Sequence, residues 1–370
     1  MTRRLTVVQL LPALDAGGVE RGTLEIAAAL VAAGHRAIVV SAGGRLLPAL
    51  LASGAEHVEL AIGRKSLFSL RHVWRLRQLI ASADIVHARS RLPAWLGWLA
   101  WRGLHGPRPR FLTTVHGLNS VNAYSAIMTR GERVIAVSRT VREHLIRHYP
   151  TLDPDRIRVI PRGIDAAHFV HGYWASAAWR RAFIAEYPAL AAAPWLCLPG
   201  RGTRLKGHAD ALRLLAALHA AGNDCCLLLL GADQAGREAY LRELRGEAER
   251  LGVAGKLVMT PPRQDVREVL AESALVLQLS RQPEAFGRTV VEALALGVPV
   301  LGWAQGGVGE LLADLYPEGA VALGDHDTLL AQARRLLAER PRPAAFNHYR
   351  VQTMQEATLA VYAELAEATP

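Results

Sequence analysis

Two glutamates flank a glycine turn in the segment 284–299, which reads EAFGRTVVEALALGVP. An apolar run of strand length, 274–280, precedes this turn, and the apolar spacing after it predicts a buried helix. The backbone amides of Gly287, Arg288 and Thr289 are then expected at the start of that helix, where the helix dipole favours an anion. The segment therefore predicts a phosphate site between a strand and a helix.

The two glutamates, Glu284 and Glu292, have a Glu-x7-Glu spacing that places one carboxylate on each side of the turn. Carboxylates in these positions can accept hydrogen bonds from sugar hydroxyls beside a bound phosphate. A second interpretation concerns the helix alone. Thr289 has the position of an N-cap and Glu292 follows three residues later, which is the spacing of a capping box. The sequence leaves both interpretations of Glu292 open.

A basic loop follows another predicted strand, 195–200. Arg201 and Lys206 bracket this loop, which contains Gly202 and leads into a predicted helix, 209–221. Two cations around a glycine loop can hold a diphosphate from the side opposite to the helix amides. A solvated basic loop is the ordinary alternative. The predicted phosphate site in the same half of the chain favours the diphosphate interpretation.

The first half of the chain begins with a pattern of strand, turn, helix and strand. Residues 5–11 predict the first strand, and Gly17 and Gly18 lie in the turn 15–20 that opens the helix. Such a pattern is typical of a βαβ unit in a parallel sheet. The glycines allow the backbone of the turn to approach a ligand closely.

Polar residues follow two more predicted strands in this half. Arg89 and Arg91 come after the strand 84–88, and His116 comes directly after the strand 110–115. Open α/β sheets bind ligands at the carboxyl ends of their parallel strands. His116 is therefore the first candidate for a ligand-contacting residue in this half.

Taken in order along the chain, these motifs resemble those of the retaining glycosyltransferases of family 4. The motifs are Gly17-Gly18-x-Glu20, the strand that ends at His116, Pro161-Arg162-Gly163-Ile164-Asp165, Arg201-x4-Lys206 and Glu284-x7-Glu292. The resemblance covers nearly the whole chain and implies an α/β fold of the GT-B type, with two facing Rossmann-like domains that contain parallel sheets. Two positions depart from the family pattern, since Ala285 replaces Gly and Arg162 replaces Asn.

The resemblance also implies a domain organisation. Residues 1–168 are expected to form an N-terminal acceptor-binding domain. Residues 169–345 are expected to form a C-terminal domain that binds the nucleotide-sugar and begins with a linking segment, 169–193. The final segment, 346–370, is expected to be a helix that packs back on the first domain. A chain of 370 residues exceeds what one hydrophobic core usually serves, which independently favours two domains.

The resemblance implies a role for each candidate residue. Those expected to act in catalysis are His116, Glu284, Arg201 and Lys206. Those expected to bind the donor are Gly17, Gly18, Arg201, Lys206, Arg263, Phe286, Gly287, Arg288, Thr289 and Glu292. Within these sets Glu284 and His116 face the donor sugar, Glu292 holds the ribose, and Arg263 lies in a loop against the base. Those expected on the acceptor side are Glu20, Arg89 and Arg91.

The implied reaction transfers a hexose from a nucleoside-diphosphate sugar, with UDP as the default nucleotide, to a glycan or glycolipid with retention of configuration. Such a transfer chiefly requires stabilising the charge on the leaving diphosphate. Arg201, Lys206 and the amides after Gly287 can supply this stabilisation without a metal or another cofactor. The segments 87–91 and 115–117 together resemble bacterial lipopolysaccharide-core transferases, so we expect an acceptor of that class.

Three alternatives are weaker. A metal-dependent transferase would use an Asp-x-Asp pair, but Asp153 and Asp155 lie in a loop, and Asp325 and Asp327 precede a helix that Asp325 caps. A nucleotide-sugar epimerase or a phosphorylase on the same fold is the next alternative, although no lysine stands out for the cofactor of the phosphorylases. A nucleic-acid-binding protein is disfavoured, because the sequence contains no recognisable motif of that kind.

The net charge of +10 is unevenly distributed. Residues 1–170 contain 23 Lys and Arg against 11 Asp and Glu, whereas residues 171–370 contain 20 against 22. The basic half indicates an anionic partner. A predicted basic amphipathic helix in this half interleaves apolar residues with cations and favours docking on an anionic membrane surface. The cations are Arg64, Lys65, Arg71, Arg75 and Arg77.

Three cysteines bear on the cellular compartment. Cys197, Cys225 and Cys226 lie in apolar surroundings without the spacing of a metal site or a disulfide framework, which favours a reducing compartment. The sequence shows neither a signal peptide nor a segment of transmembrane length. We therefore expect a cytoplasmic protein that is peripheral on the inner face of the cytoplasmic membrane.

Overall fold

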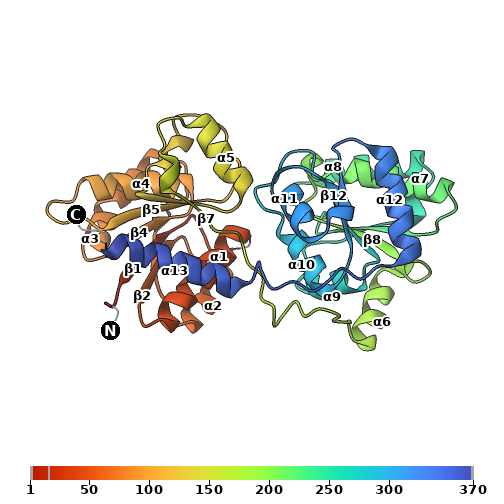
Figure 1. Ribbon diagram of the computed structural model, residues 1–370, viewed down its shortest axis with the longest axis horizontal. Helices are drawn as coiled ribbons and strands as arrows, with labels where there is room; N and C mark the ends of the chain where they lie inside the picture. The colour runs from red at the N-terminus through yellow and green to blue at the C-terminus, as the bar shows by residue number, and fades with distance from the viewer. Residues whose placement is uncertain (1–2, 16, 368–370) are drawn as a thin grey trace. The chain divides into compact units, whose positions relative to one another are not determined.

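The computed structural model describes residues 3–15 and 17–367 and divides into two compact units (Figure 1). The first unit contains Met1–Gly163 and Tyr349–Pro370, and the second contains Ile164–His348. Ala16 of the predicted glycine turn and residues 368–370 of the predicted C-terminal segment lie outside the described residues.

The first unit is built on a seven-stranded parallel sheet with the order β3-β2-β1-β4-β5-β6-β7. The order reverses between β1 and β4, which makes this pair the topological switch point of the sheet. The strands are β1 (Thr6–Leu10), β2 (Arg36–Ser41), β3 (Glu56–Glu59), β4 (Ile85–Ala88), β5 (Arg110–Val115), β6 (Arg133–Ala136) and β7 (Ile157–Val159).

Helices cover this sheet, so most of its strands read as apolar runs. They are α1 (Gly18–Ala32), α2 (Leu47–Ala52), α3 (His72–Ile80), α4 (Arg91–Arg102), α5 (Arg139–His148) and α13 (Val351–Glu367), with the 3-10 turns η1 (Leu67–Arg71), η2 (Ser125–Thr129) and η3 (Pro154–Arg156). None of the helices within residues 3–15 and 17–367 combines the length and the apolar character that a membrane span needs.

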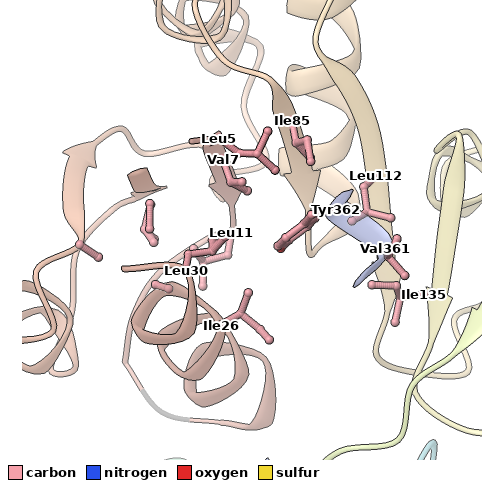
Figure 2. Packing of buried hydrophobic residues seen from close by; sticks show 14 of the residues in the cluster. Leu5, Val7, Leu11, Ile26, Leu30, Ile85, Leu112, Ile135, Val361 and Tyr362 are labelled. Carbon is pink, nitrogen blue, oxygen red and sulfur yellow. The ribbon is translucent and has the colours of Figure 1, made fainter. Parts of the chain in front are cut away.

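Helix α13 comes from the end of the chain and completes the core of the first unit. Its buried residues Met354, Val361 and Tyr362 pack in one cluster with Ile26 and Leu30 of α1 and with residues of the sheet. Figure 2 shows Tyr362 amid this cluster. The helix begins at Val351 rather than at the predicted residue 346, because Tyr349 has a left-handed φ of 60° that a helix cannot contain.

The second unit is built on a six-stranded parallel sheet with the order β10-β9-β8-β11-β12-β13. Its order reverses between β8 and β11. The strands are β8 (Trp195–Pro199), β9 (Cys226–Leu230), β10 (Leu257–Met259), β11 (Leu275–Gln278), β12 (Val300–Trp303) and β13 (Ala320–Val321).

The helices of the second unit alternate with these strands. They are α6 (Ala177–Glu186), α7 (His208–Ala220), α8 (Glu238–Arg250), α9 (Val266–Glu272), α10 (Arg288–Leu296), α11 (Gly306–Leu315) and α12 (His326–Glu339), with the 3-10 turns η4 (Pro188–Leu190), η5 (Arg204–Lys206), η6 (Ala254–Lys256) and η7 (Pro317–Gly319). Both units are therefore Rossmann-like, and the predicted α/β fold with two parallel sheets is confirmed. The three cysteines are buried and free.

Candidate active site

In the second unit, the predicted basic loop and the predicted phosphate turn leave neighbouring strands. The loop 200–207 follows β8 and the loop 279–287 follows β11, and these strands form the switch point at which open α/β sheets bind ligands. The loops touch directly, because the amide of Arg281 donates to the carbonyl of Leu205 at 2.8 Å. A Cβ on Gly207 would lie 1.8 Å from the carbonyl oxygen of Leu279, so only glycine permits this approach.

Lys206 and Glu284 meet across these two loops. The Nζ of Lys206 lies 2.6 Å from Oε1 of Glu284, and the hydroxyl of Ser280 donates to the same oxygen. Both charged side chains keep about a quarter of their surface exposed, at 25% and 22%. A cation predicted to bind phosphate and a carboxylate predicted to bind sugar are therefore held together at the switch point.

Helix α10 starts two residues earlier than the capping-box interpretation requires. Its N-cap is Gly287, which has a φ of 101°, and no described side chain caps the helix. The predicted N-cap Thr289 is wrong, because its Oγ1 accepts a hydrogen bond from Nε2 of Gln278 at 2.6 Å. The first amides of the helix, including those of Arg288 and Thr289, thus begin a helix without a side-chain cap, as an anion site requires.

Glu292 lies in the second turn of α10, so it cannot be the third residue of a capping box. The residue is only 5% exposed. Its Oε1 accepts from Nε of Arg288 at 3.0 Å, one helical turn away. A buried carboxylate beside a cation at the start of a helix is suited to bind a polar ligand group such as a ribose hydroxyl.

The remaining donor-site candidates of the second unit differ in their surroundings. Arg201 is exposed and makes no side-chain hydrogen bond or ion pair with another described residue. Phe286 is 8% exposed and packs in the core. Arg263 is engaged by the carboxylates of Asp265 and Glu186, which raise its pKa, and it packs over aromatic rings. Its geometry supports a structural role, and the predicted base contact stays a prediction.

In the first unit, the glycine turn forms the start of α1. Gly17 is the N-cap with a φ of 145°, and a Cβ there would lie 2.5 Å from Oε2 of Glu20. The carboxylate of Glu20 therefore folds back over the turn. Burial raises the pKa of Glu20, and nearby Arg162 partly opposes this shift.

The two arginines after β4 do not form one surface. Arg89 is only 3% exposed, donates to Oε1 of Gln9 at 2.8 Å, and has its pKa lowered to about 10 by burial. Arg91 instead donates to Oγ of Ser125 at 3.2 Å and lies over the ring of Tyr124. Because Arg89 is buried, little of its surface is available for the acceptor contact that the sequence predicted.

His116 follows β5 and contacts a residue whose role the sequence did not indicate. Nη2 of Arg162 lies 2.6 Å from Nδ1 of His116. Arg162 reaches the first turns of α1, where a Cβ on Gly22 would lie 1.9 Å from Nη1. Burial, together with Arg162 and Arg89, holds the pKa of His116 well below its usual range. The only sequence signal for Arg162 was its replacement of the family's Asn.

The two Asp-x-Asp pairs have structural roles. Asp153 accepts from the amide of Asp155 at the start of η3, and Asp325 caps α12 by accepting from the amide of Thr328. The predicted N-cap role of Asp325 is confirmed. Within residues 3–15 and 17–367, no group of three or more His, Cys, Asp or Glu residues is arranged to hold a metal ion.

The chain matches two family models in succession. Residues 16–168 match the model described as Glycosyltransferase Family 4, and residues 186–352 match the model described as Glycosyl transferases group 1. A curated relative, the D-inositol 3-phosphate glycosyltransferase of Xylanimonas cellulosilytica, is 29% identical over 266 residues, which cover 66% of this chain and 61% of that protein. The match thus spans less than two thirds of that relative.

A second curated relative and two solved structures extend the comparison. The alpha-maltose-1-phosphate synthase of Mycolicibacterium smegmatis is 31% identical over 273 residues, or 68% of each protein. A glycosyltransferase from Rickettsia africae ESF-5 has a TM-score of 0.84 with 27% identity over all of both chains. Anabaena HepE in complex with UDP-glucose has a TM-score of 0.76 over 98% of this chain and 100% of HepE, but its 19% identity shows the fold alone. With the two successive family matches, these relationships show that the chain belongs to the family 4 glycosyltransferases and has their GT-B fold.

Proposed function

We propose that this glycosyltransferase transfers a hexose from UDP-hexose to an acceptor with retention of configuration. The observation that carries the proposal is the contact between Lys206 and Glu284 beside the start of α10. A cation, a carboxylate and a helix start without a side-chain cap lie together there, at the switch point of the second sheet. This combination suits a ligand that contains both a diphosphate and a sugar.

The proposed chemistry depends on stabilising the leaving diphosphate. Arg201, Lys206 and the first amides of α10 supply positive charge and hydrogen-bond donors for the developing charge. Glu284 accepts from hydroxyls of the reacting sugar, and Glu292 accepts from the ribose. Because these groups provide the electrostatic stabilisation, the proposed reaction needs no divalent metal. In the front-face substitution that the family resemblance implies, the leaving phosphate helps to deprotonate the acceptor.

The comparisons support the choice of donor only indirectly. HepE was solved with UDP-glucose, and that ligand belongs to HepE. The shared fold makes a UDP-sugar the first donor to test for this chain.

We propose that the acceptor is a phosphorylated glycan or glycolipid, with lipopolysaccharide core as the specific candidate. The excess of 23 basic over 11 acidic residues within residues 1–170 favours an anionic acceptor. The curated relatives are named for inositol 3-phosphate and for maltose 1-phosphate, which are phosphorylated compounds but are not core glycolipids. Acceptor chemistry therefore has to be tested with both classes.

We further propose that the first unit docks on an anionic membrane surface. Around η1 and α3, Phe68 is 78%, Leu70 51% and Trp74 65% exposed. Four of the cations that the sequence predicted for this surface are exposed as well: Arg64, Lys65, Arg71 and Arg75. Exposed aromatic side chains beside cations are typical of surfaces that bind anionic membranes. The prediction was wrong for the fifth cation, Arg77, because this side chain packs against Gly103 and is half-buried.

A donor and acceptor screen tests the proposed function. Purified protein is incubated with a set of nucleotide-sugars, and nucleotide release is followed with no acceptor, with sugar phosphates and with lipopolysaccharide-core acceptor. Acceptor-dependent release of UDP with an α-linked product from an α-linked donor is the expected result. Interconversion of free UDP-sugars without transfer would instead support the epimerase alternative. An inverted product would contradict the retaining mechanism.

A further inference from the structure

Arg162 and His116 form a contact that fixes where the histidine carries its proton. Nη2 of Arg162 lies 2.6 Å from Nδ1 of His116. A guanidinium has only donors, so Nδ1 must accept this hydrogen bond and cannot carry a proton. The ring proton of the neutral imidazole is then on Nε2. We propose that Arg162 holds His116 as the neutral Nε2–H tautomer, which makes His116 a hydrogen-bond donor to substrate and prevents it from acting as a general base.

Protonation of His116 would break this contact. A proton on Nδ1, in the imidazolium or in the other neutral tautomer, would point an N–H at the N–H of Arg162. Two other ionisable groups influence the pKa of the ring: Arg89, which follows β4, and His87, which lies within it. Neither is a carboxylate. The low pKa of His116 has burial as its largest cause and the charges of Arg162 and Arg89 as its next causes, which agrees with the geometry.

The fold leaves Arg162 little freedom to move away. Arg162 is only 8% exposed, and its Nη1 contacts the sulfur of Met354 in α13. The missing side chain of Gly22 makes room for the guanidinium against α1. The next residue, Gly163, is fixed too, since a Cβ there would lie 2.3 Å from the carbonyl oxygen of Arg350. The backbone on one side and the packing on the other thus hold the guanidinium beside His116.

The opposite ring nitrogen is left with an unused donor. Nε2 of His116 is buried and has no hydrogen-bond partner among the described residues. A buried N–H without an acceptor is unfavourable, so a bound ligand that supplies an acceptor oxygen is favoured at this position. This step rests on the proposed function, in which the oxygen belongs to a substrate sugar hydroxyl. Because Nε2 already carries its proton, the acceptor hydroxyl must lose its proton to another group.

The tautomer can be measured without any enzymatic activity. Long-range ¹H–¹⁵N correlation spectra of the full chain labelled with ¹⁵N-histidine distinguish the two neutral tautomers from the imidazolium. The signals of His116 are assigned by their absence in His116→Gln. We expect the Nε2–H pattern in the wild type from pH 5 to pH 8, the range in which an unperturbed histidine changes charge. An Nδ1–H pattern, or titration with an ordinary midpoint, would overturn the proposal.

The variant Arg162→Met tests the role of the arginine. It removes the hydrogen bond that fixes the tautomer but leaves the ring buried, so the Nδ1–H tautomer of His116 should become populated, while the spectrum of His57 of β3 should match that of the wild type. A pure Nε2–H pattern of His116 in Arg162→Met would refute the positioning role. If this variant does not fold, the wild-type spectrum still decides the tautomer.

A matched pair of substitutions tests the donor role in turnover. The side-chain amide of Gln can place an N–H near the position of Nε2, whereas the shorter amide of Asn resembles the Nδ1 side of the ring. We expect His116→Gln to be about tenfold more active than His116→Asn, the effect of about one hydrogen bond. Equal activities would contradict the donor role. A wild type without transfer activity would refute the proposed function but would leave the spectroscopic result intact.

Discussion

Lys206 and Glu284 form an ion pair in which Nζ lies 2.6 Å from Oε1, and the hydroxyl of Ser280 donates a hydrogen bond to the same oxygen. A bound diphosphate and this carboxylate would therefore both be attracted to the same ammonium group. In the proposed function, Lys206 has two roles: it offers charge to a phosphate, and it orients Glu284. Arg201 has no such second role, because it makes no side-chain contact of this kind with a described residue.

The variants Arg201→Ala and Lys206→Ala should both weaken the use of the donor. A charge-assisted contact contributes about 1.5 to 3 kcal/mol, which corresponds to about tenfold or more in affinity. Lys206→Ala should also lower turnover, because Glu284 loses its partner, whereas Arg201→Ala should act mainly on the donor KM. Initial rates at varied UDP-sugar concentration measure both effects.

The neighbouring Arg204 provides the control for these variants. It lies in the same loop but is exposed and pairs with Glu243, so Arg204→Ala should leave donor kinetics near those of the wild type. Unchanged donor kinetics in both Arg201→Ala and Lys206→Ala, with the fold intact, would remove the diphosphate assignment.

The two glutamates should be separable in function. Glu292→Gln should mainly weaken binding of free UDP, because its proposed partner is the ribose, and Glu284→Gln should mainly lower turnover, because its proposed partner is the reacting sugar. Calorimetric titration with UDP and steady-state kinetics separate these effects. Normal UDP binding by Glu292→Gln would leave the residue only its contact with Arg288.

Transfer should not depend on a divalent metal. In the proposed reaction, the cations and helix amides take the role that a metal would have at the leaving diphosphate. Rates measured after extensive treatment with chelator should therefore equal the untreated rates. Loss of activity that Mg²⁺ or Mn²⁺ restores would contradict this expectation. The pairs Asp153/Asp155 and Asp325/Asp327 would then again be candidates for metal binding.

Burial of His208 should make the stability of the second unit depend on pH. The residue is fully buried at the start of α7, and burial lowers its pKa to about 4 from the usual 6.5. The unfolded chain then binds the proton more readily, so this contribution to stability is complete above about pH 6.5 and is lost as the pH falls toward 4. At pH 5 the loss should be about 2 kcal/mol relative to pH 7.5.

Denaturant titrations of the wild type and of His208→Gln at these two pH values check this effect. The variant should lack this part of the pH dependence, while the contributions of the buried His87 and His116 remain in both proteins. Equal losses of stability in both proteins on acidification would show that His208 is not the responsible group.

The sequence predicted those features that repeat in every parallel α/β sheet. Apolar runs located most strands, and the glycines at 17 and 287 marked the turns after two of them. The predicted N-cap of α10 was wrong, because both Gly287 and Thr289 are acceptable N-cap residues and only tertiary packing selects between them. A contact to Gln278 decided the position of Thr289.

Long-range contacts of long side chains could not be predicted from spacing. Arg162 and His116 are 46 residues apart, and nothing local indicates that they touch. The burial of Arg89 was missed for a similar reason, since a charged residue after a strand usually lies at the surface. Gly22 carried no turn signal, and its role became visible only as the space that Arg162 fills.

The exposed aromatic and basic surface around α3 should bind anionic vesicles reversibly. Each basic residue near such a surface contributes about 1 kcal/mol, and this attraction is screened over about 8 to 10 Å at physiological salt. The protein should therefore co-sediment with anionic vesicles at low salt, less at high salt, and not with neutral vesicles.

Trp74→Ala should weaken binding, and so should the charge reversals Arg71→Glu and Arg75→Glu. Trp174 of the second unit is a matched control because it is equally exposed, at 65%, so Trp174→Ala should bind as the wild type does. Equal binding to anionic and neutral vesicles, or binding to neither, would leave Phe68, Leu70 and Trp74 without this function.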